Sequence, residues 1–316
     1  MSDVTIGLVG VGKIARDQHL PAIAATTGCR LVATADPFAS LDDVPAYETL
    51  AAMLDDWPEI TAVAICTPAH IRHTLARLAL SHGKHVLLEK PPGATLSEVE
   101  DLIAMAAKQG VSLFAAWHSR FAPGVARARE WLAARCVHHV AIEWKEDVRV
   151  WHPGQAWIWQ PGGMGVFDPG INALSVATTI LPQPFFLRQA RLLVPANCQT
   201  PIAAELSFAD SQGGVMQADF DFRQTGPQIW DIHVETEAGR LSLTRGGCRL
   251  SIDGQLELEA QESEYATMYA HFAELIAAGQ SDVDVAPLRH VADAFLYGYR
   301  ESGDAFIESP VGSVAR

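Results

Sequence analysis

Short apolar runs alternate with helix-like stretches through the first 116 residues of the chain. The runs are apolar at successive positions, which is typical of strands that are buried on both faces. Strands that alternate with helices form βαβ units, and these build a parallel sheet with helices on both sides. We therefore expect strands at residues 4–9, 31–35, 60–66, 85–88 and 113–116, and helices at 14–25, 71–80 and 96–107.

The pattern changes near residue 120, where a helical stretch at 124–134 is followed by longer, half-polar runs. Alternating polarity indicates a largely antiparallel sheet with one exposed face. At 316 residues the chain is also longer than a usual domain of about 100 to 200 residues. The predicted fold is α/β, with a doubly wound parallel sheet in a domain at residues 1–119 and a large, mostly antiparallel open sheet in an α/β domain at 120–316. Further strands are expected at 137–144, 203–208, 215–222 and 229–235, and helices at 265–278 and 288–302.

The charge balance narrows the class of partner. Lys and Arg total 23 against 37 Asp and Glu, a net charge of −14, which argues against nucleic acid and anionic membrane surfaces as partners.

The sequence also indicates where the protein is located. No apolar stretch reaches the roughly 18 residues of a membrane span, and the N-terminus lacks the features of a signal peptide. Five widely spaced cysteines without a CxxC pair indicate free thiols in a reducing compartment. We expect a cytoplasmic protein.

The segment Gly10-Val11-Gly12-Lys13-Ile14-Ala15 follows the first expected strand and opens the first helix. It matches G-x-G-x-x-G/A in the context that gives this motif meaning, the turn of a Rossmann-type fold. Gly10 permits the tight turn, Gly12 lets the backbone approach a pyrophosphate, and Ala15 allows close packing of helix on strand. The motif predicts a dinucleotide site. The alternative is an ordinary glycine-rich turn between strand and helix.

Asp36 ends the second expected strand, 26 positions after Gly10. An acidic residue there accepts hydrogen bonds from the adenosine ribose hydroxyls and repels a 2′-phosphate. The next four residues contain no Arg that would bind such a phosphate, so NAD is favoured over NADP. The alternative is that Asp36 only caps a turn before Pro37.

Two further motifs leave expected parallel strands at their carboxyl ends, where ligands of open α/β sheets bind. Cys66-Thr67-Pro68 leaves one strand, and Glu89-Lys90-Pro91-Pro92 leaves the next. The two prolines stiffen the backbone beside Lys90 and direct its side chain, which favours a role in a site. The alternative is a solvated pair of Lys90 with Glu89.

Together, the GxGxxA turn, the Thr67-Pro68 pair and the segment at residues 83–91 resemble the glucose-fructose oxidoreductase, inositol dehydrogenase (Gfo/Idh/MocA) family. The segments at residues 12–19, 144–149 and 151–172 are most similar to the galactose and arabinose 1-dehydrogenases within it. The resemblance implies a Rossmann domain, a second domain that binds a sugar, and a homo-oligomer, expected as a dimer. It also implies that Lys90 lies near nicotinamide and substrate. The cofactor-binding residues expected from motif and resemblance are Gly10, Gly12, Lys13, Ile14, Asp36, Thr67, Pro68, Glu89 and Lys90.

Many relatives carry an Asp-x-x-x-His pair at the sugar pocket, and this chain has Asp168 with Asn172 in place of the histidine. An amide has no proton to exchange, so Asn172 can orient a hydroxyl but cannot act as a base. The expected reaction is oxidation of C1 of D-galactose or L-arabinose to the lactone, with Asp168 as base and Lys90 polarising O1. An N-cap role is the alternative for Asp168. The expected substrate-binding residues are Lys90, His118, Glu146, Trp151, Asp168, Asn172 and Trp230, with His152 near them.

Two pairs, His70 with His73 and His82 with His85, have a spacing known from metal ligands but lack companion carboxylates or cysteines, so no metal is expected. Two other functions stay open. One is oxidation or reduction of another sugar or polyol by the same chemistry, and the other is a non-catalytic sensor of dinucleotide and sugar.

Overall fold

The computed structural model describes residues 3–308, and the chain divides into two units. The first consists of the residues up to Phe121 together with Ser263–Val285, and the second of Ala122–Glu262 together with the residues from Ala286 onward. The boundary expected at residues 119 and 120 therefore leaves out the segment 263–285. Within the described residues, no helix is both long and apolar enough to cross a membrane.

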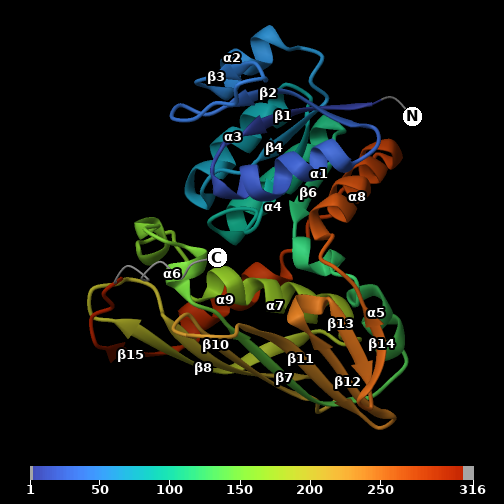
Figure 1. The fold of residues 1–316 in the computed structure, drawn as a ribbon, viewed down its shortest axis with the longest axis vertical. Coiled ribbons are helices and arrows are strands. Elements are labelled where there is room, and N and C mark those ends of the chain that lie inside the picture. The colour runs from blue at the N-terminus through green and yellow to red at the C-terminus, as the bar shows by residue number, and fades with distance from the viewer. Residues whose placement is uncertain (1–2, 309–316) are drawn as a thin grey trace. The chain divides into compact units, whose positions relative to one another are not determined.

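The first unit is built on a six-stranded parallel sheet in the order β3-β2-β1-β4-β5-β6 (Figure 1). Order reverses between β1 and β4, and the carboxyl ends of strands beside such a switch point form the usual ligand site of open α/β sheets. The strands are β1 (Val4–Val9), β2 (Cys29–Ala35), β3 (Ala46–Tyr47), β4 (Ala62–Ile65), β5 (His85–Glu89) and β6 (Leu113–Ala116).

Successive side chains of these strands point to opposite faces of the sheet, and those on both faces are buried. Helices therefore cover both faces. On one face Ile6, Leu8 and Leu87 pack with α1 (Leu20–Ala25) and α8 (Glu264–Ala278). On the other, Val63 and Val86 pack with α2 (Leu50–Asp56), α3 (Ala69–Ser81) and α4 (Leu96–Gln109). The helix expected at 14–25 begins with a π-helical turn, η1 (Ala15–His19), and a 3-10 turn, η2 (His118–Phe121), follows β6.

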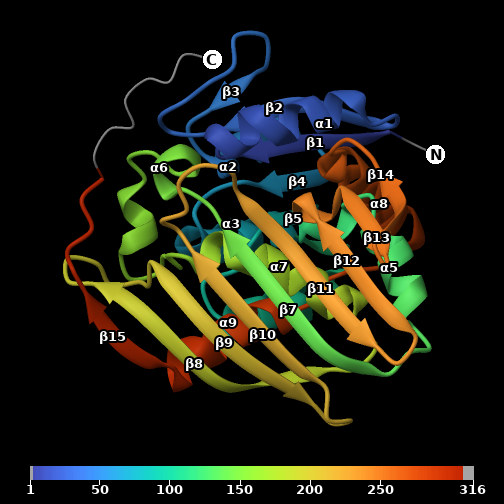
Figure 2. The ribbon, with the colours of Figure 1, turned by 60° about the horizontal axis from the view of Figure 1, so that its bottom comes forward.

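The second unit contains a nine-stranded mixed sheet in the order β14-β13-β12-β11-β7-β10-β9-β8-β15 (Figure 2). Its pairs are antiparallel except β7 with β10 and β8 with β15, which confirms the expected fold class. Helices α5 (Val125–Leu132), α7 (Phe167–Ile180) and α9 (Ala286–Tyr297) pack on one face. The strands are β7 (Val137–Lys145), β8 (Phe185–Pro195), β9 (Ala203–Asp210), β10 (Val215–Asp221), β11 (Ile229–Thr236), β12 (Gly239–Thr244), β13 (Arg249–Ile252), β14 (Gln255–Glu259) and β15 (Tyr299–Gly303).

One expectation was wrong at the end of the chain. The helix predicted at 288–302 stops at Tyr297, and β15 then pairs with β8. A Cβ at Gly298 would lie 2.4 Å from the Ala294 carbonyl oxygen, so this position admits only glycine as the chain turns. The short helix α6 (Val148–Trp151) and the 3-10 turns η3 (Ala156–Trp159) and η4 (Arg245–Gly247) complete the unit.

Candidate active site

The turn after β1 leaves room for a dinucleotide where the motif predicts one. Gly10 has φ +89°, and a Cβ there would lie 3.0 Å from the Thr67 backbone nitrogen, so this glycine lets two loops meet. A Cβ at Gly12, in contrast, would have nothing within 4 Å. Ala15 is fully buried, as close helix packing requires. The open space at Gly12 fits the approach of a pyrophosphate to the backbone.

The carboxylate of Asp36 lies against this turn. Its Oδ2 accepts a hydrogen bond from the Val11 backbone N–H at 2.7 Å. Its Oδ1 accepts from the backbone N–H groups of Phe38 at 2.8 Å and Ala39 at 3.1 Å. Asp36 therefore does cap the turn that follows it, but it also places a negative charge beside the glycine-rich segment.

The loop after β4 supplies a polar atom that has no partner in the protein. The Oγ1 atom of Thr67 is buried without a hydrogen bond, and a buried hydroxyl normally has one. A bound ligand would satisfy it, so Thr67 fits a cofactor site. The other residues expected at the cofactor lie as follows. Pro68 directly precedes helix α3, and Ile14 packs against the hydrophobic core. The exposed Lys13 ammonium group forms an ion pair with Asp17.

Glu89 and Lys90 stand at the carboxyl end of β5. Glu89 is only 3% exposed, so a solvated surface pair with Lys90 is not what the structure contains. Its Oε2 accepts a hydrogen bond from the Lys90 backbone N–H at 2.7 Å. Burial opposes its charge, but the hydrogen bond and charge of His19, with the charges of His118 and Lys90, lower the pKa of Glu89 to about 2. The carboxyl group is ionised across the physiological range.

His118, expected at the sugar, belongs to the first unit. Its Nδ1 is hydrogen-bonded to the Glu264 carboxylate, and its ring stacks on Tyr265 with centroids 5.0 Å apart. Both partners lie on α8, in the segment that returns to the first unit. The imidazole is thus oriented by an acidic partner and an aromatic ring.

Asp168 and Asn172 lie one helical turn apart on α7 in the second unit. Helix α7 begins at Phe167, so Asp168 is inside the first turn and the N-cap position is held by Val166, not by Asp168. Asp168 is 4% exposed, and the Oδ1 atom of Asn172 is buried without a hydrogen bond. A buried amide oxygen of this kind suits a ligand hydroxyl as donor.

A histidine joins two carboxylates at this point. The Nε2 atom of His152 lies 3.4 Å from Oδ2 of Asp168 and 3.9 Å from Oε1 of Glu146. Glu146 follows β7 and is 6% exposed. The arrangement places two buried acids around one imidazole, which is a setting for proton transfer.

Two tryptophans lie beside these acids. The Nε1–H of Trp230 donates to Oε2 of Glu146 at 3.1 Å. The rings of Trp151 and Trp230 are 5.4 Å apart at 64°, and Trp151 is 41% exposed. Indole faces of this kind suit the apolar faces of a sugar ring.

The structure therefore gathers the predicted residues into two groups, one in each unit. The first unit holds the residues that are expected to bind the cofactor, together with Lys90 and His118. The second unit holds Asp168, Glu146, Asn172 and the two tryptophans. Reasoning from sequence missed Arg72, whose guanidinium donates to the carbonyl oxygens of the loop that carries Lys90, and His19, whose Nε2 lies 3.1 Å from Oε1 of Glu89. It also did not commit to His152. Within residues 3–308, no three His, Cys, Asp or Glu side chains are grouped to hold a metal.

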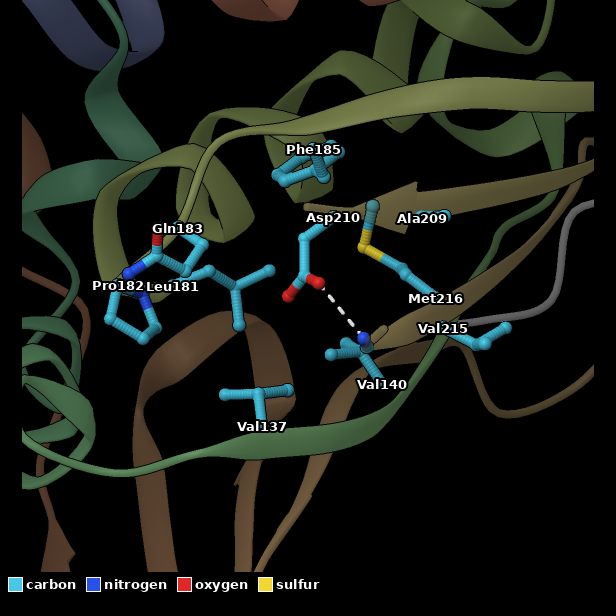
Figure 3. A pocket seen from close by; sticks show the side chains of 11 residues that line it. Val137, Val140, Leu181, Pro182, Gln183, Phe185, Ala209, Asp210, Val215 and Met216 are labelled. Carbon is cyan, nitrogen blue, oxygen red and sulfur yellow. Dashed lines mark hydrogen bonds between the residues drawn. The ribbon is translucent and has the colours of Figure 1, made fainter. Parts of the chain in front are cut away.

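A small cavity in the second unit holds none of these residues (Figure 3). It has a volume of about 20 Å³ and lies beyond Leu181, at the opposite end of α7 from Asp168. Its one carboxylate, on Asp210, accepts a hydrogen bond from the Gly214 N–H. The lining residues are otherwise mostly apolar, so this cavity offers little to a sugar.

Known proteins are similar to this chain along almost its whole length, which includes both groups of residues. Residues 4–116 match the oxidoreductase family with an NAD-binding Rossmann fold, GFO_IDH_MocA. Galactose 1-dehydrogenase of Pseudomonas fluorescens is 47% identical over 308 residues, which are 98% of this chain and 100% of that protein. A D-galactose-1-dehydrogenase crystal structure from Rhizobium etli is 56% identical, with a TM-score of 0.93 over 97% of this chain and 99% of that one. The 3-ketoreductase KijD10 of Actinomadura kijaniata, solved with NADP and TDP-benzene, shares the fold at 19% identity and a TM-score of 0.81, over 96% of this chain and 100% of that one.

Proposed function

The chain belongs to the Gfo/Idh/MocA oxidoreductase family with its NAD-binding Rossmann fold, and on this premise we propose that it is an NAD(P)-dependent aldose 1-dehydrogenase. It oxidises C1 of D-galactose, L-arabinose or both to the aldonolactone. The observation that carries the proposal is the buried carboxylate of Asp168, 3.4 Å from His152 and one turn before the unpaired Oδ1 atom of Asn172. A galactose 1-dehydrogenase relative that is 47% identical along nearly the whole chain supports the substrate class.

Asp168 is the proposed base. The C1–H bond breaks with both of its electrons, the O1–H proton passes to the Asp168 carboxylate, and the C1–O1 bond becomes the carbonyl of the lactone. Bound NAD(P) supplies the hydride acceptor at the nicotinamide. As the hydride leaves, C1 becomes cation-like and O1–H becomes acidic, so a carboxylate is a sufficient base. His152 beside Asp168 provides the next group along which the proton can leave.

Lys90 is proposed to hold O1 of the sugar. An ammonium group there stabilises negative charge that develops on O1 as its proton departs. Lys90 belongs to the first unit and Asp168 to the second, so the proposal requires that both reach the same C1–O1 group. Substitution of either residue should then lower kcat, and the double variant should be little worse than the poorer single variant.

The remaining residues are proposed to read the sugar. Asn172 accepts a hydrogen bond from a ring hydroxyl, and Glu146 accepts one from another. Trp151 and Trp230 pack on the C–H face, and His118 contacts a further hydroxyl. D-Galactose and L-arabinose share their configuration at C2 to C4, so a pocket that reads only those hydroxyls accepts both.

The test is NADH or NADPH absorbance with D-galactose, L-arabinose, D-glucose and myo-inositol, each with NAD and with NADP. Formation of NADH with galactose or arabinose, together with lactone in the product, supports the proposal and ranks the sugars. Oxidation of glucose or inositol alone would move the function to another sugar or polyol. Binding of NAD without turnover on any sugar would overturn the proposal in favour of a sensor.

We also propose that the protein is cytoplasmic, which its five free cysteines support, and that it is a homodimer, as the family resemblance implies. Light scattering of the purified protein measures the oligomeric state. A monomer that is fully active would contradict the dimer.

A further inference from the structure

Four buried polar side chains, one of them that of Glu89, form a cluster in the first unit. His19 and Tyr269 are fully buried, Glu89 is 3% exposed and Tyr265 is 5% exposed. The Nε2 atom of His19 lies 3.1 Å from Oε1 of Glu89, and the hydroxyl of Tyr265 donates to the same oxygen at 2.8 Å. The other ring nitrogen of His19 lies 2.7 Å from the Tyr269 hydroxyl. We call these residues the Glu89 cluster.

The cluster holds a charge pair. Burial by itself lowers the pKa of His19, but neighbouring Cys66 and Tyr269 and hydrogen bonds to Cys66 and Glu89 raise it well above its ordinary value. Burial and the Glu89 charge raise the pKa of Tyr265, so its hydroxyl stays a donor. An imidazolium beside a carboxylate is the state that this hydrogen bonding favours. A buried pair of this kind is costly to form, so its presence is weak evidence that it serves stability alone.

The cluster joins the cofactor turn to the loop that carries Lys90. His19 is the last residue of the π-helical turn that follows the GxGxxA segment, and π turns occur frequently at functional sites. Glu89 ends β5, and its second oxygen, Oε2, is hydrogen-bonded to the Lys90 backbone N–H. Both oxygens of Glu89 thus serve as acceptors, one for His19 and Tyr265 and one for the main chain of Lys90.

Arg72 holds the same loop from α3. Its guanidinium donates to the carbonyl oxygens of Glu89, Pro91 and Thr67, and the side chain is 3% exposed. The carbonyls on both sides of Lys90 are therefore fixed by Arg72, while its N–H is fixed by Glu89. The backbone on both sides of the Lys90 side chain is thus held in place.

We propose that His19 is a positioning residue for Lys90, acting through Glu89. The imidazolium keeps Glu89 ionised and oriented, and Glu89 in turn fixes the Lys90 backbone from which the ammonium group reaches the substrate. The proposal rests on the catalytic role given to Lys90 above. A misplacement of about 1 Å in a catalytic group can cost roughly a hundredfold in rate, so the loss of this support should appear in kcat.

The central variant is His19→Gln, which keeps hydrogen-bonding groups but removes the positive charge. We expect kcat to fall at least about tenfold, with KM for NAD changed less than about twofold, because the cofactor turn itself is intact. Without the counter-charge, Glu89 protonates more easily, so the acid limb of the kcat–pH profile should move to higher pH. The other titratable groups that face the pair are Cys66, Lys90, His118, Glu264, Tyr265 and Tyr269.

The matched control is His85→Gln, at the opposite end of the same strand β5. His85 is partly buried, and its Nδ1 accepts a hydrogen bond from the Ser112 N–H, but it has no contact with the cluster. Its substitution should leave kcat and the pH profile unchanged. If His19→Gln and His85→Gln both lower the unfolding temperature while kcat stays within twofold of the wild type, His19 is only structural and the proposal is overturned.

A second readout does not depend on turnover. The chain has five lysines, so reductive methylation with ¹³C-formaldehyde gives few dimethyl-lysine NMR signals, and Lys90→Arg identifies that of Lys90. We expect His19→Gln to shift the Lys90 signal and its titration, and His85→Gln to leave both unchanged. An unshifted Lys90 signal overturns the positioning role even in an enzyme without measurable turnover. A shifted signal in a protein that oxidises no sugar would support it while the proposed function fails.

If His19→Gln does not fold, Tyr265→Phe removes one donor to Glu89 and keeps the imidazole. We expect the same effects to be weaker in this variant. The value of kcat should fall about two- to fivefold, and the NMR signal of Lys90 should shift. An unchanged kcat and an unchanged signal in this variant would overturn the proposal.

Discussion

The Nε2 atom of His152 lies 3.4 Å from the Oδ2 atom of Asp168, although 15 residues separate them in the sequence. The 3-10 turn η3 lies between them, and the chain then reaches the start of α7. The residue expected from related proteins at the sugar pocket, a histidine four positions after the aspartate, is Asn172 here. His152 supplies an imidazole to the same carboxylate from a different segment.

Asp168→Asn should lower kcat by about 10² to 10⁴-fold, because the amide cannot accept the O1 proton. KM for the sugar should change far less, since the amide keeps the shape of the side chain. Initial rates of NADH formation measure both. Asp210→Asn, at the cavity beyond the far end of α7, is the matched control and should leave kcat unchanged. A kcat near the wild-type value in Asp168→Asn would remove this residue from the mechanism.

The two glycines of the cofactor turn should respond differently to alanine. Gly10→Ala forces a Cβ to within 3.0 Å of the Thr67 backbone nitrogen at φ +89°, and should lower the free energy of unfolding by roughly 1 to 3 kcal/mol. Gly12→Ala meets nothing within 4 Å, so the free energy of unfolding should change by less than about 0.5 kcal/mol. Its methyl group enters the space of the pyrophosphate, and the Kd for NAD should rise about tenfold or more. Urea unfolding and fluorescence titration with NAD distinguish the two, and equal NAD affinity in Gly12→Ala would contradict a dinucleotide at this turn.

Asp36→Asn should shift cofactor preference toward NADP. The amide keeps an acceptor for the Val11 N–H but removes the charge that repels a 2′-phosphate. The ratio of kcat/KM with NADP to that with NAD should rise about tenfold, as Coulomb repulsion at short range predicts. Asp43→Asn, an exposed carboxylate in the same loop, is the control for general charge and should change the ratio little. An unchanged ratio in Asp36→Asn would show that this residue only caps its turn.

The pair of His19 with Glu89 predicts a dependence of stability on pH. The pKa of His19 is raised in the folded protein relative to about 6.5 in the unfolded chain. Its contribution is therefore complete below pH 6.5 and is lost as the pH rises through the folded pKa. The wild type should be more stable than His19→Gln at pH 6, and urea unfolding from pH 6 to 10 should show this difference shrinking. A difference that stays constant over this range would mean that His19 is neutral when folded.

Much of the fold could be predicted from sequence because its signals are local. The strands at 4–9 and 113–116 have the expected bounds, and the first of these apolar runs ends sharply at Gly10. Strand β8 was missed because its sequence, FFLRQARLLVP, mixes charged and apolar residues without strict alternation. The small edge strands β3 and β15 depend on their neighbours for pairing, which no local pattern records.

The site shows the same division. Asp36, Lys90 and Asp168 could be named as candidates from sequence because each lies in a motif at the end of a strand or the start of a helix. Arg72 and His19 could not, because a buried arginine or histidine on a helix is marked only by its partners. Those partners are a main-chain loop in one case and Glu89 in the other, and both are distant in the sequence.

The return of Ser263–Val285 to the first unit has a consequence for synthesis of the chain. Helix α8 contributes Met268, Tyr269 and Phe272 to the core beneath β1 and β4. When only the first 121 residues have been synthesised, helix α8 is still missing from one face of the parallel sheet. The cofactor half cannot reach its final packing until the nine-stranded half has nearly been translated, so the two halves must mature together rather than in order.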